Sequence, residues 1–213
     1  MTRFVSCDQS TSSCALTLWE GEIPIAKKVI KTGSSRSKTH KKDVIYFPII
    51  TQQIDYICDC IVNYMKESNA ELFVSESPSM GSFGDAKATL LTLFRAINET
   101  IVEKNVLSED KVISYAPTAV KSFARTFLPL EEQKEIKSKP VKDKKTKEII
   151  GYQDVEVLCE MNKNRMIQAC NSEAPDGWLD GLTLSSGKAD YADSFWIGKT
   201  YLSGKQPTKK KEK

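Results

Sequence analysis

The sequence predicts an α/β fold with a mixed sheet. Apolar runs of strand type come first, in a hairpin meander, and then alternate with helical patterns, so antiparallel neighbours precede strands that are joined by crossover helices. The chain has 213 residues, of which 40% are apolar and 28% charged. That length and composition suit one domain with a full core and argue against wholesale disorder.

Five strands and four helices of the predicted core follow in order along the chain. Strands are expected at Phe4–Cys7, Cys14–Trp19, Ile23–Ile30, Leu72–Val74 and Val112–Tyr115. Helices are expected from Ile50 to Met65, from Asp85 to Ile101, from Pro117 to Phe127 and from Asp190 to Leu202.

A lysine-rich insertion interrupts this rhythm at about residues 130–157, and we expect a surface hairpin or a flexible loop there. A further helix is predicted from about Val157 to Cys170. Residues 1–204 are expected to form a single domain, and residues 205–213 a flexible basic tail.

Composition excludes several classes of function. No apolar run approaches the length of a membrane helix, and the start of the chain does not resemble a secretory signal. The six cysteines are expected to be reduced thiols of a cytoplasmic protein. His40 is the one histidine, which excludes multi-histidine metal sites. Any metal chemistry must therefore run on carboxylates, which favour Mg²⁺ or Mn²⁺.

Positive charge gathers in three segments although the net charge is only +3. Clusters of this kind indicate a polyanionic partner, and the alternative is an ordinary solvated surface. The members are Lys31, Arg36, Lys38, Lys41 and Lys42; Lys134, Lys137, Lys139, Lys142, Lys144, Lys145 and Lys147; and Lys209, Lys210, Lys211 and Lys213.

Four acids come from three separate segments that the predicted topology can bring together. Asp8 and Glu76 each follow a buried strand, and ligands bind at the carboxyl ends of strands in α/β sheets. Asp190 and Asp193 are three apart on a helix and so share one face. Each acid alone has an ordinary explanation, as a strand-end cap, a surface ion pair or a helix cap. Together they predict a site for two divalent cations, the arrangement used in phosphodiester hydrolysis.

These residues resemble the RuvC-like Holliday junction resolvases of the RNase H-like fold, especially viral or phage members. The similarity runs from Phe4 to about Leu202. It rests on the strand ending at Asp8, on Val74-Ser75-Glu76, on Ala116 to Lys121, and on Asp190-Tyr191-Ala192-Asp193-Ser194. Where the family has a glycine soon after the first aspartate, this chain has Gln9-Ser10-Thr11.

The resemblance implies an RNase H-like fold with a mixed five-stranded sheet and helices on both faces. It implies that Asp8, Glu76, Asp190 and Asp193 hold two Mg²⁺ or Mn²⁺ ions, with Lys121 at the site and Lys163 as a second basic residue near it. One ion would activate a water and the other would stabilise the leaving 3′ oxygen. The implied protein is a homodimer that cuts four-way DNA junctions. A phage-encoded member would act in the cytoplasm of a bacterial host.

Further residues are predicted to contact DNA. Phe83 could wedge or stack at the junction centre, or anchor its loop in the core. Phosphates of the junction arms would be held by lysines of two segments, namely Lys38, Lys41, Lys42, Lys142, Lys144 and Lys145. The apolar residues Leu90, Leu93, Phe94 and Ile97 either form a dimer face or, as is commoner for such a stripe, belong to the core.

Three alternatives remain open from the sequence. Another nuclease of the same fold could cut RNA–DNA hybrids or other branched DNA. An actin-like or sugar-kinase-like ATPase is suggested by Asp8-Gln9-Ser10-Thr11-Ser12, although the chain is short for two such domains and lacks a second glycine-rich phosphate loop. A junction-binding protein without catalysis would tolerate loss of the acids.

Overall fold

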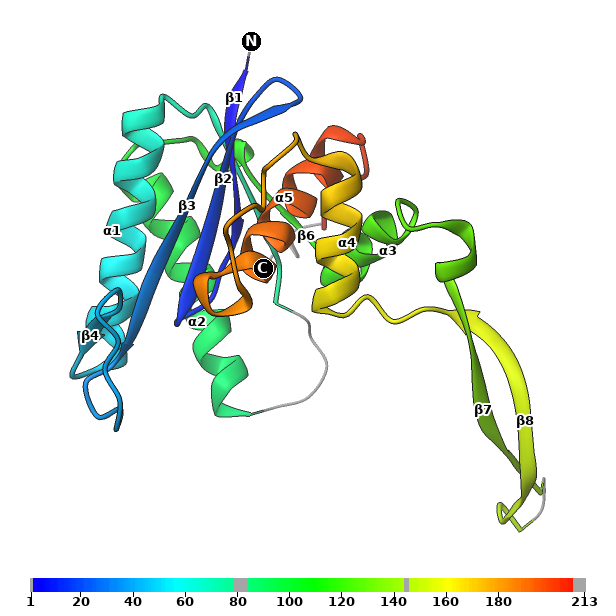
Figure 1. Ribbon diagram of the computed structural model, residues 1–213. Helices are drawn as coiled ribbons and strands as arrows, with labels where there is room; N and C mark the ends of the chain where they lie inside the picture. The colour runs from blue at the N-terminus through cyan, green and yellow to red at the C-terminus, as the bar shows by residue number, and fades with distance from the viewer. Residues whose placement is uncertain (1, 79–83, 144–145, 209–213) are drawn as a thin grey trace.

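A central sheet between two layers of helices forms the body of the protein (Figure 1). The computed structural model describes residues 2–78, 84–143 and 146–208. Within those residues, no helix is both long and apolar enough to span a bilayer. The strands are β1 (Arg3–Asp8), β2 (Ser13–Glu20), β3 (Ile23–Ser34), β4 (Ile45–Phe47), β5 (Leu72–Glu76), β6 (Val112–Tyr115), β7 (Lys134–Lys142) and β8 (Ile149–Leu158).

The sheet confirms the predicted mixture of antiparallel and parallel pairs. Its strand order is β4-β3-β2-β1-β5-β6. Strand β1 pairs antiparallel with β2, and β2 pairs antiparallel with β3, whereas β1, β5 and β6 run parallel to one another. The parallel strands β1 and β5 therefore end at the same edge of the sheet, which is where ligands bind in α/β folds.

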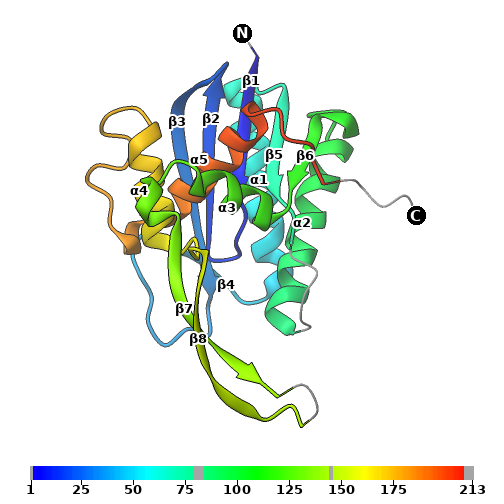
Figure 2. The same cartoon turned by 90° about the vertical axis from the view of Figure 1, so that its right-hand side faces the viewer.

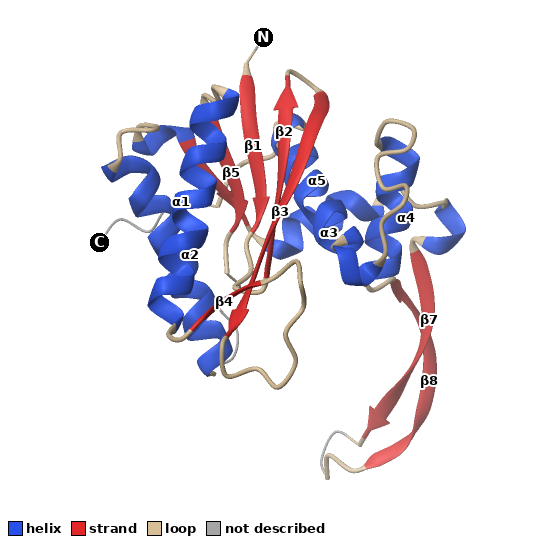
Figure 3. Ribbon diagram, turned by 60° about the vertical axis from the view of Figure 1, so that its left-hand side comes forward, coloured by secondary structure: helices blue, strands red, loops and turns tan. Residues whose placement is uncertain are grey.

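Helices cover both faces of the sheet, as the resemblance implied (Figure 3). Two of them pack on one face over a core that includes Val5, Leu16, Ile57 and Phe73. The other three pack on the opposite face over a core that includes Phe4 and Trp19. The first pair is α1 (Ile50–Ser68) and α2 (Asp85–Glu103), and the three on the other face are α3 (Pro117–Arg125), α4 (Lys163–Glu173) and α5 (Lys188–Leu202).

The sheet has six strands where the sequence predicts five. The additional strand is β4, which runs parallel to the end of β3, with Thr32 opposite Ile45 and Ser34 opposite Phe47. Because β4 has three residues, it is too short for a period-2 pattern to be recognised in the sequence. Strand β3 also continues four residues beyond the predicted end at Ile30.

The lysine-rich insertion forms a hairpin, β7–β8, that projects from the body (Figure 2). The predicted helix from about Val157 is wrong at its start, because β8 runs to Leu158 and α4 begins at Lys163. Asn162 sets that beginning, since its side chain accepts a hydrogen bond from the backbone N–H of Arg165 at 3.1 Å. Asp85 lies in the first turn of α2, whose N-cap is Gly84.

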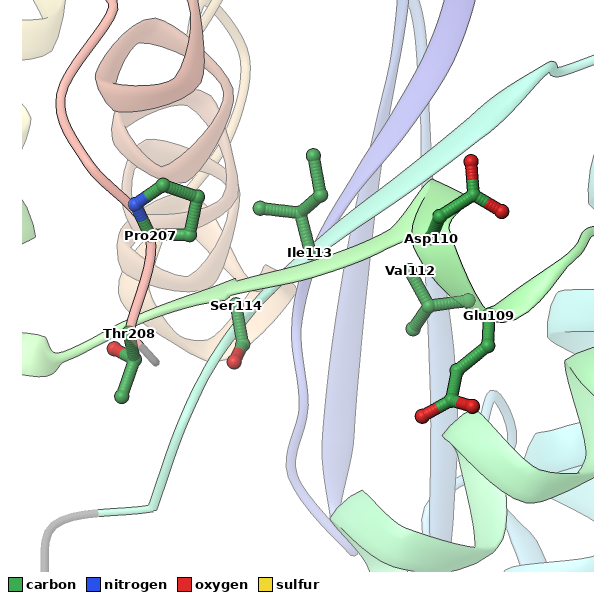
Figure 4. Close-up of a pocket in the computed structure, with 7 residues that line it drawn as sticks. All are labelled: Glu109, Asp110, Val112, Ile113, Ser114, Pro207 and Thr208. Carbon is green, nitrogen blue, oxygen red and sulfur yellow. The ribbon is translucent and has the colours of Figure 1, made fainter. Parts of the chain in front are cut away.

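Residues 205–208, the start of the predicted basic tail, run along the outer edge of β6. The backbone N–H of Thr208 donates to the carbonyl oxygen of Ser114 at 2.9 Å, and the Tyr115 hydroxyl donates to that of Lys205 at 3.0 Å. Figure 4 shows the hollow of about 550 Å³ that this segment borders with Glu109 and Asp110. None of the predicted site residues lines this hollow, so the candidate site lies elsewhere.

Candidate active site

Two of the predicted acids end neighbouring parallel strands. Asp8 is the last residue of β1 and Glu76 the last residue of β5, and the register pairs Cys7 with Ser75 immediately before them. Adjacent strands lie about 4.8 Å apart. The backbone therefore brings the two acids to one point of the sheet edge.

Helix α5 brings the other two acids because a buried polar network holds it against β1 and β2. The Ser6 hydroxyl donates to the carbonyl oxygen of Ser194 at 2.7 Å, and the Ser194 and Thr17 hydroxyl oxygens are 2.8 Å apart. Trp19 donates its indole N–H to the Ser6 hydroxyl at 2.8 Å. At Gly198 a side chain would overlap the Trp19 ring, so only a glycine allows the helix this close to the sheet.

The start of α5 is held against the start of β2. The hydroxyl of Ser13 donates a hydrogen bond to Oδ2 of Asp190. Gly187, at φ 98°, precedes the helix, and a Cβ at this position would meet the same two side chains. Its left-handed conformation lets the chain enter α5 sharply, because glycine carries no Cβ penalty there. Asp190 is thereby held near the sheet edge where Asp8 ends β1, one helical turn before Asp193.

The acids act on one another electrostatically. Burial, followed by the negative charges of Asp193 and Glu76, raises the pKa of Asp8 well above its usual value. Burial and then Asp193 raise the pKa of Glu76 to about 7. Burial raises the pKa of Asp193 to about 6, with a further contribution from Asp190. A buried set of like charges in mutual range favours binding of a cation.

The donor chemistry of this cluster fits a hard divalent cation. All four side chains supply carboxylate oxygens, the ligand type that Mg²⁺ and Mn²⁺ prefer. Oδ1 of Asp193 is buried and has no hydrogen-bond partner in the described structure, so it can accept a cation without breaking an existing bond. Among the described residues, no three His, Cys, Asp or Glu side chains already converge with the geometry of a metal site. The four acids therefore interact electrostatically but are not arranged as a complete coordination shell.

Two of the predicted lysines lie at this cluster. The charge of Lys121, on α3, lowers the pKa of Glu76 and of Asp193. Lys163, the first residue of α4, lowers the pKa of Asp193 as well. Both lysines are exposed, so their ammonium groups can also reach a phosphate of a bound substrate.

The remaining predicted contacts fall elsewhere. Lys38, Lys41 and Lys42 are exposed on the loop between β3 and β4, and Lys142 is exposed near the tip of the hairpin. None of these four is among the charges that shift the pKa values of the acids. Three further predicted residues, Phe83, Lys144 and Lys145, lie outside the described residues.

The apolar stripe of α2 is mostly core. Leu93 and Ile97 are 0% and 2% exposed and belong to the core, and Leu90 is partly buried against the same cluster. Phe94 is partly exposed. The core interpretation of this stripe therefore holds for Leu93 and Ile97.

Two residues of the site were not predicted. The side-chain amide of Gln9 donates to the carbonyl oxygen of Glu76 and so ties the ends of β1 and β5 together. Gln9 is 7% exposed, and its Oε1 is buried without a partner in the described structure. Ser13, which holds Asp190, is the second. One feature of the sequence could have identified Gln9. It follows Asp8 directly, in the segment where the resembled family has a glycine.

Comparison with known proteins supports the fold through structure alone. No family model and no curated protein sequence matches this chain. Its fold is similar to that of Thermus thermophilus RuvC in complex with a Holliday junction substrate, at TM-score 0.55 and 10% identity over 96% of this chain and 95% of that one. A second structure of Thermus thermophilus RuvC matches at TM-score 0.53 and 12% identity, covering 97% and 100% of the two chains.

The yeast mitochondrial Holliday junction resolvase Ydc2 is also similar, at TM-score 0.53 and 13% identity over 94% of this chain and 78% of that one. The class defined by these observations is therefore α/β of the RNase H-like type. Within that class, the chain has a RuvC-like fold.

Proposed function

We propose that this protein is a structure-specific endonuclease that cleaves four-way DNA junctions by metal-dependent phosphodiester hydrolysis. The observation that carries the proposal is the placement of Asp8, Glu76, Asp190 and Asp193 at one sheet edge of a RuvC-like fold. Two of the similar structures are Holliday junction resolvases by name or by bound substrate, which supports the same substrate here.

The four carboxylates are the residues that would hold the cations. Two Mg²⁺ or Mn²⁺ ions in this position would supply an activated water and stabilise the leaving 3′ oxygen, giving a 5′ phosphate product. Gln9 holds the ends of β1 and β5 together and keeps an unpartnered buried Oε1 beside them, so we assign it as a further oxygen donor of this centre.

The surrounding residues bind and orient the DNA backbone. Lys121 and Lys163 offset part of the negative charge of the cluster, and they can pair with the phosphate next to the cleaved bond. Ser10 and Ser12, in the turn after Asp8, present hydroxyl groups at the same edge. Farther out, phosphates of the junction arms would be held through salt-sensitive contacts by Lys38, Lys41, Lys42, Lys142, Lys144 and Lys145.

We further propose that the active protein is a homodimer. A four-way junction is close to two-fold symmetric, so two copies related by a two-fold axis would cut opposite strands symmetrically. Phe83 comes seven residues after Glu76 in the sequence and is our candidate for stacking at the junction centre.

A nicking assay tests the proposal. The wild-type protein with Mg²⁺ should nick a synthetic four-way junction in preference to a linear duplex and an RNA–DNA hybrid, and it should not turn over ATP. Asp8→Asn should abolish cleavage and leave junction binding in Ca²⁺ largely intact, because the variant keeps the shape of the site and loses one ligand charge. Full activity of Asp8→Asn would remove the metal-site claim, and a preference for the hybrid would assign the chain to another nuclease of this fold.

A further inference from the structure

The β7–β8 hairpin carries features that the acid cluster does not explain. It is a two-stranded ribbon in which all nine residues of β7 are paired, from Lys134 opposite Leu158 to Lys142 opposite Ile149. At about 3.4 Å per residue it is about 30 Å long, close to one turn of duplex DNA. An isolated two-stranded ribbon is only marginally stable in water, so its exposed apolar residues point to a partner.

The root of the hairpin is fixed to helices α3 and α4 of the body. Arg165 binds Glu135 at 3.0 Å, and Arg125 donates to the carbonyl oxygen of Cys159 at 3.0 Å. The backbone N–H of Cys159 donates to the carbonyl oxygen of Gln133 at 2.9 Å, which closes the base of the ribbon. Four residues after Cys159 comes Lys163, whose charge acts on an acid of the cluster. The hairpin therefore starts beside α3 and α4 and extends away from the body (Figures 1 and 2).

Charge differs between the two halves of the ribbon. The inner half consists of residues 134–138 and 154–158 and carries three acids. Both of its lysines are paired with acids of the same half. Lys134 binds Glu156 at 2.6 Å, and Lys137 binds Glu135 at 2.9 Å. The outer half, residues 139–142 with 149–153, carries Lys139 and Lys142 and no acid. The ion pairs of the inner half, including that of Glu135 with Arg165, leave it without a net positive charge, whereas the two lysines of the outer half attract a polyanion.

The outer half also exposes an apolar group. Ile150 is 66% exposed and Tyr152 68%, and the register places Pro140 opposite Tyr152. Pro140 and Tyr152 therefore share one face of the ribbon, and Ile150 lies at the bulge where the register shifts between Val141 and Lys142. Lys139 and Lys142 lie on either side of Pro140 along β7, and their long side chains can bend toward phosphates that flank the apolar group.

We propose that the outer half of the β7–β8 hairpin is an arm that enters a groove of a duplex arm of the DNA substrate. Pro140, Ile150 and Tyr152 contact the base edges or wedge between base steps, and Lys139 and Lys142 contact the phosphates on either side. The major groove is about 12 Å wide and admits a two-stranded ribbon, and apolar wedges occur in groove-binding proteins. This inference rests on the proposed function, because it assigns the surface that holds the same DNA.

Three paired variants of the 213-residue chain separate the contributions. Ile150→Ser with Tyr152→Ser removes the apolar group, and Lys139→Gln with Lys142→Gln removes the two charges. Ile136→Ser with Leu158→Ser is the matched control, because these side chains are 75% and 61% exposed but lie in the acidic inner half. Equilibrium binding to a synthetic four-way junction is measured in Ca²⁺ between about 50 and 200 mM salt.

The apolar pair should weaken binding about tenfold at every salt concentration without changing the slope of log K against log salt, since the loss is not electrostatic. The lysine pair should reduce that slope by about 2, one per phosphate contact. The control pair should match the wild type in both. Tyr152→Phe keeps the aromatic ring and should retain affinity, which separates a lost contact from a disrupted ribbon.

Two results would overturn the inference. One is that the Ile150→Ser, Tyr152→Ser variant binds the junction with wild-type affinity. The other is that this variant changes its sedimentation and not its DNA binding, which would assign the apolar residues to an interface with a second copy of the chain. Cleavage of the junction by the wild-type protein is scored separately. Failure of the arm is therefore distinguishable from failure of the proposed nuclease activity.

Discussion

Glu76 offers the sharpest quantitative test of the acid cluster. Its pKa rises from 4.5 to about 7 in the folded protein, because of burial and then the charge of Asp193. At 1.36 kcal/mol per pKa unit, the ionised carboxylate costs the fold about 3 kcal/mol. Glu76→Gln removes that charge with little change in shape, so it should stabilise the metal-free protein at alkaline pH.

The sign of the pH dependence follows from proton linkage. The folded state keeps its proton to a higher pH than the unfolded state, so the stability of the wild type falls as pH rises from about 4.5 to about 7. Glu76→Gln should therefore be about 3 kcal/mol more stable than the wild type at pH 8, and less than about 1 kcal/mol more stable at pH 5. For a chain of this length, about 3 kcal/mol corresponds to a rise in Tm of roughly 6–12 °C.

Thermal and urea unfolding in EDTA at pH 5 and pH 8 measure this difference. Glu71→Gln is the control, because Glu71 is exposed just before β5 and outside the cluster. Adding Mg²⁺ at pH 8 should stabilise the wild type and should stabilise Glu76→Gln much less. If Glu76→Gln melts at or below the wild-type temperature at pH 8 in EDTA, the electrostatic cost assigned to the ionised Glu76 carboxylate is refuted.

Three other perturbations address the parts that support the acids. Gln9→Met should lower Mn²⁺ affinity in the absence of DNA by about tenfold, measured by calorimetry. Gln53→Met, which removes a buried amide of α1 that donates to the Thr11 carbonyl oxygen in the same turn as Gln9, should leave that affinity unchanged. Gly198→Ala should cost about 1–3 kcal/mol and weaken Mn²⁺ binding by displacing α5, whereas Gly151→Ala, in open space on the hairpin, should change neither. Lys121→Gln should move the acidic limb of the cleavage pH profile to higher pH, since its charge lowers the pKa of two of the acids; an unmoved limb would place the lysine outside the site.

The sheet and the approach of the acids could be predicted because both depend on local patterns. Short buried runs that end in Asp8 and Glu76 identify strand ends, and the alternation of strands and helices identifies the parallel pairing that places those ends together. The boundary of α4 could not be predicted in this way. Val157 fits both a period-2 pattern with Val155 and a helical pattern with later residues, and the strand prevails through pairing with β7.

The supporting residues of the site were beyond prediction for a different reason. Gln9 and Ser13 act through the direction of a side chain toward a segment 67 and 177 residues away along the chain. No periodicity encodes such a contact, because it exists only after β5 and α5 have docked on β1 and β2. Residue type alone gave no reason to separate these two side chains from the other polar residues of the same turn.

The docking of α5 shows why the Asp190–Asp193 pair indicates a metal site only when the position of the helix in the fold is known. An aspartate pair three residues apart is common on a solvated helix, and its spacing is satisfied by any surface position. Here Ser194 is buried against Ser6 and Thr17, and Gly198 meets the Trp19 indole, so the helix can approach the sheet on this face alone. Asp193 precedes Ser194 directly and is therefore carried to the edge where β1 ends. The small and polar residues of α5 thus determine where its charges lie. A larger side chain on the face of α5 that contacts the sheet should move Asp193 away from Asp8 and Glu76 at a smaller loss of stability than unfolding requires.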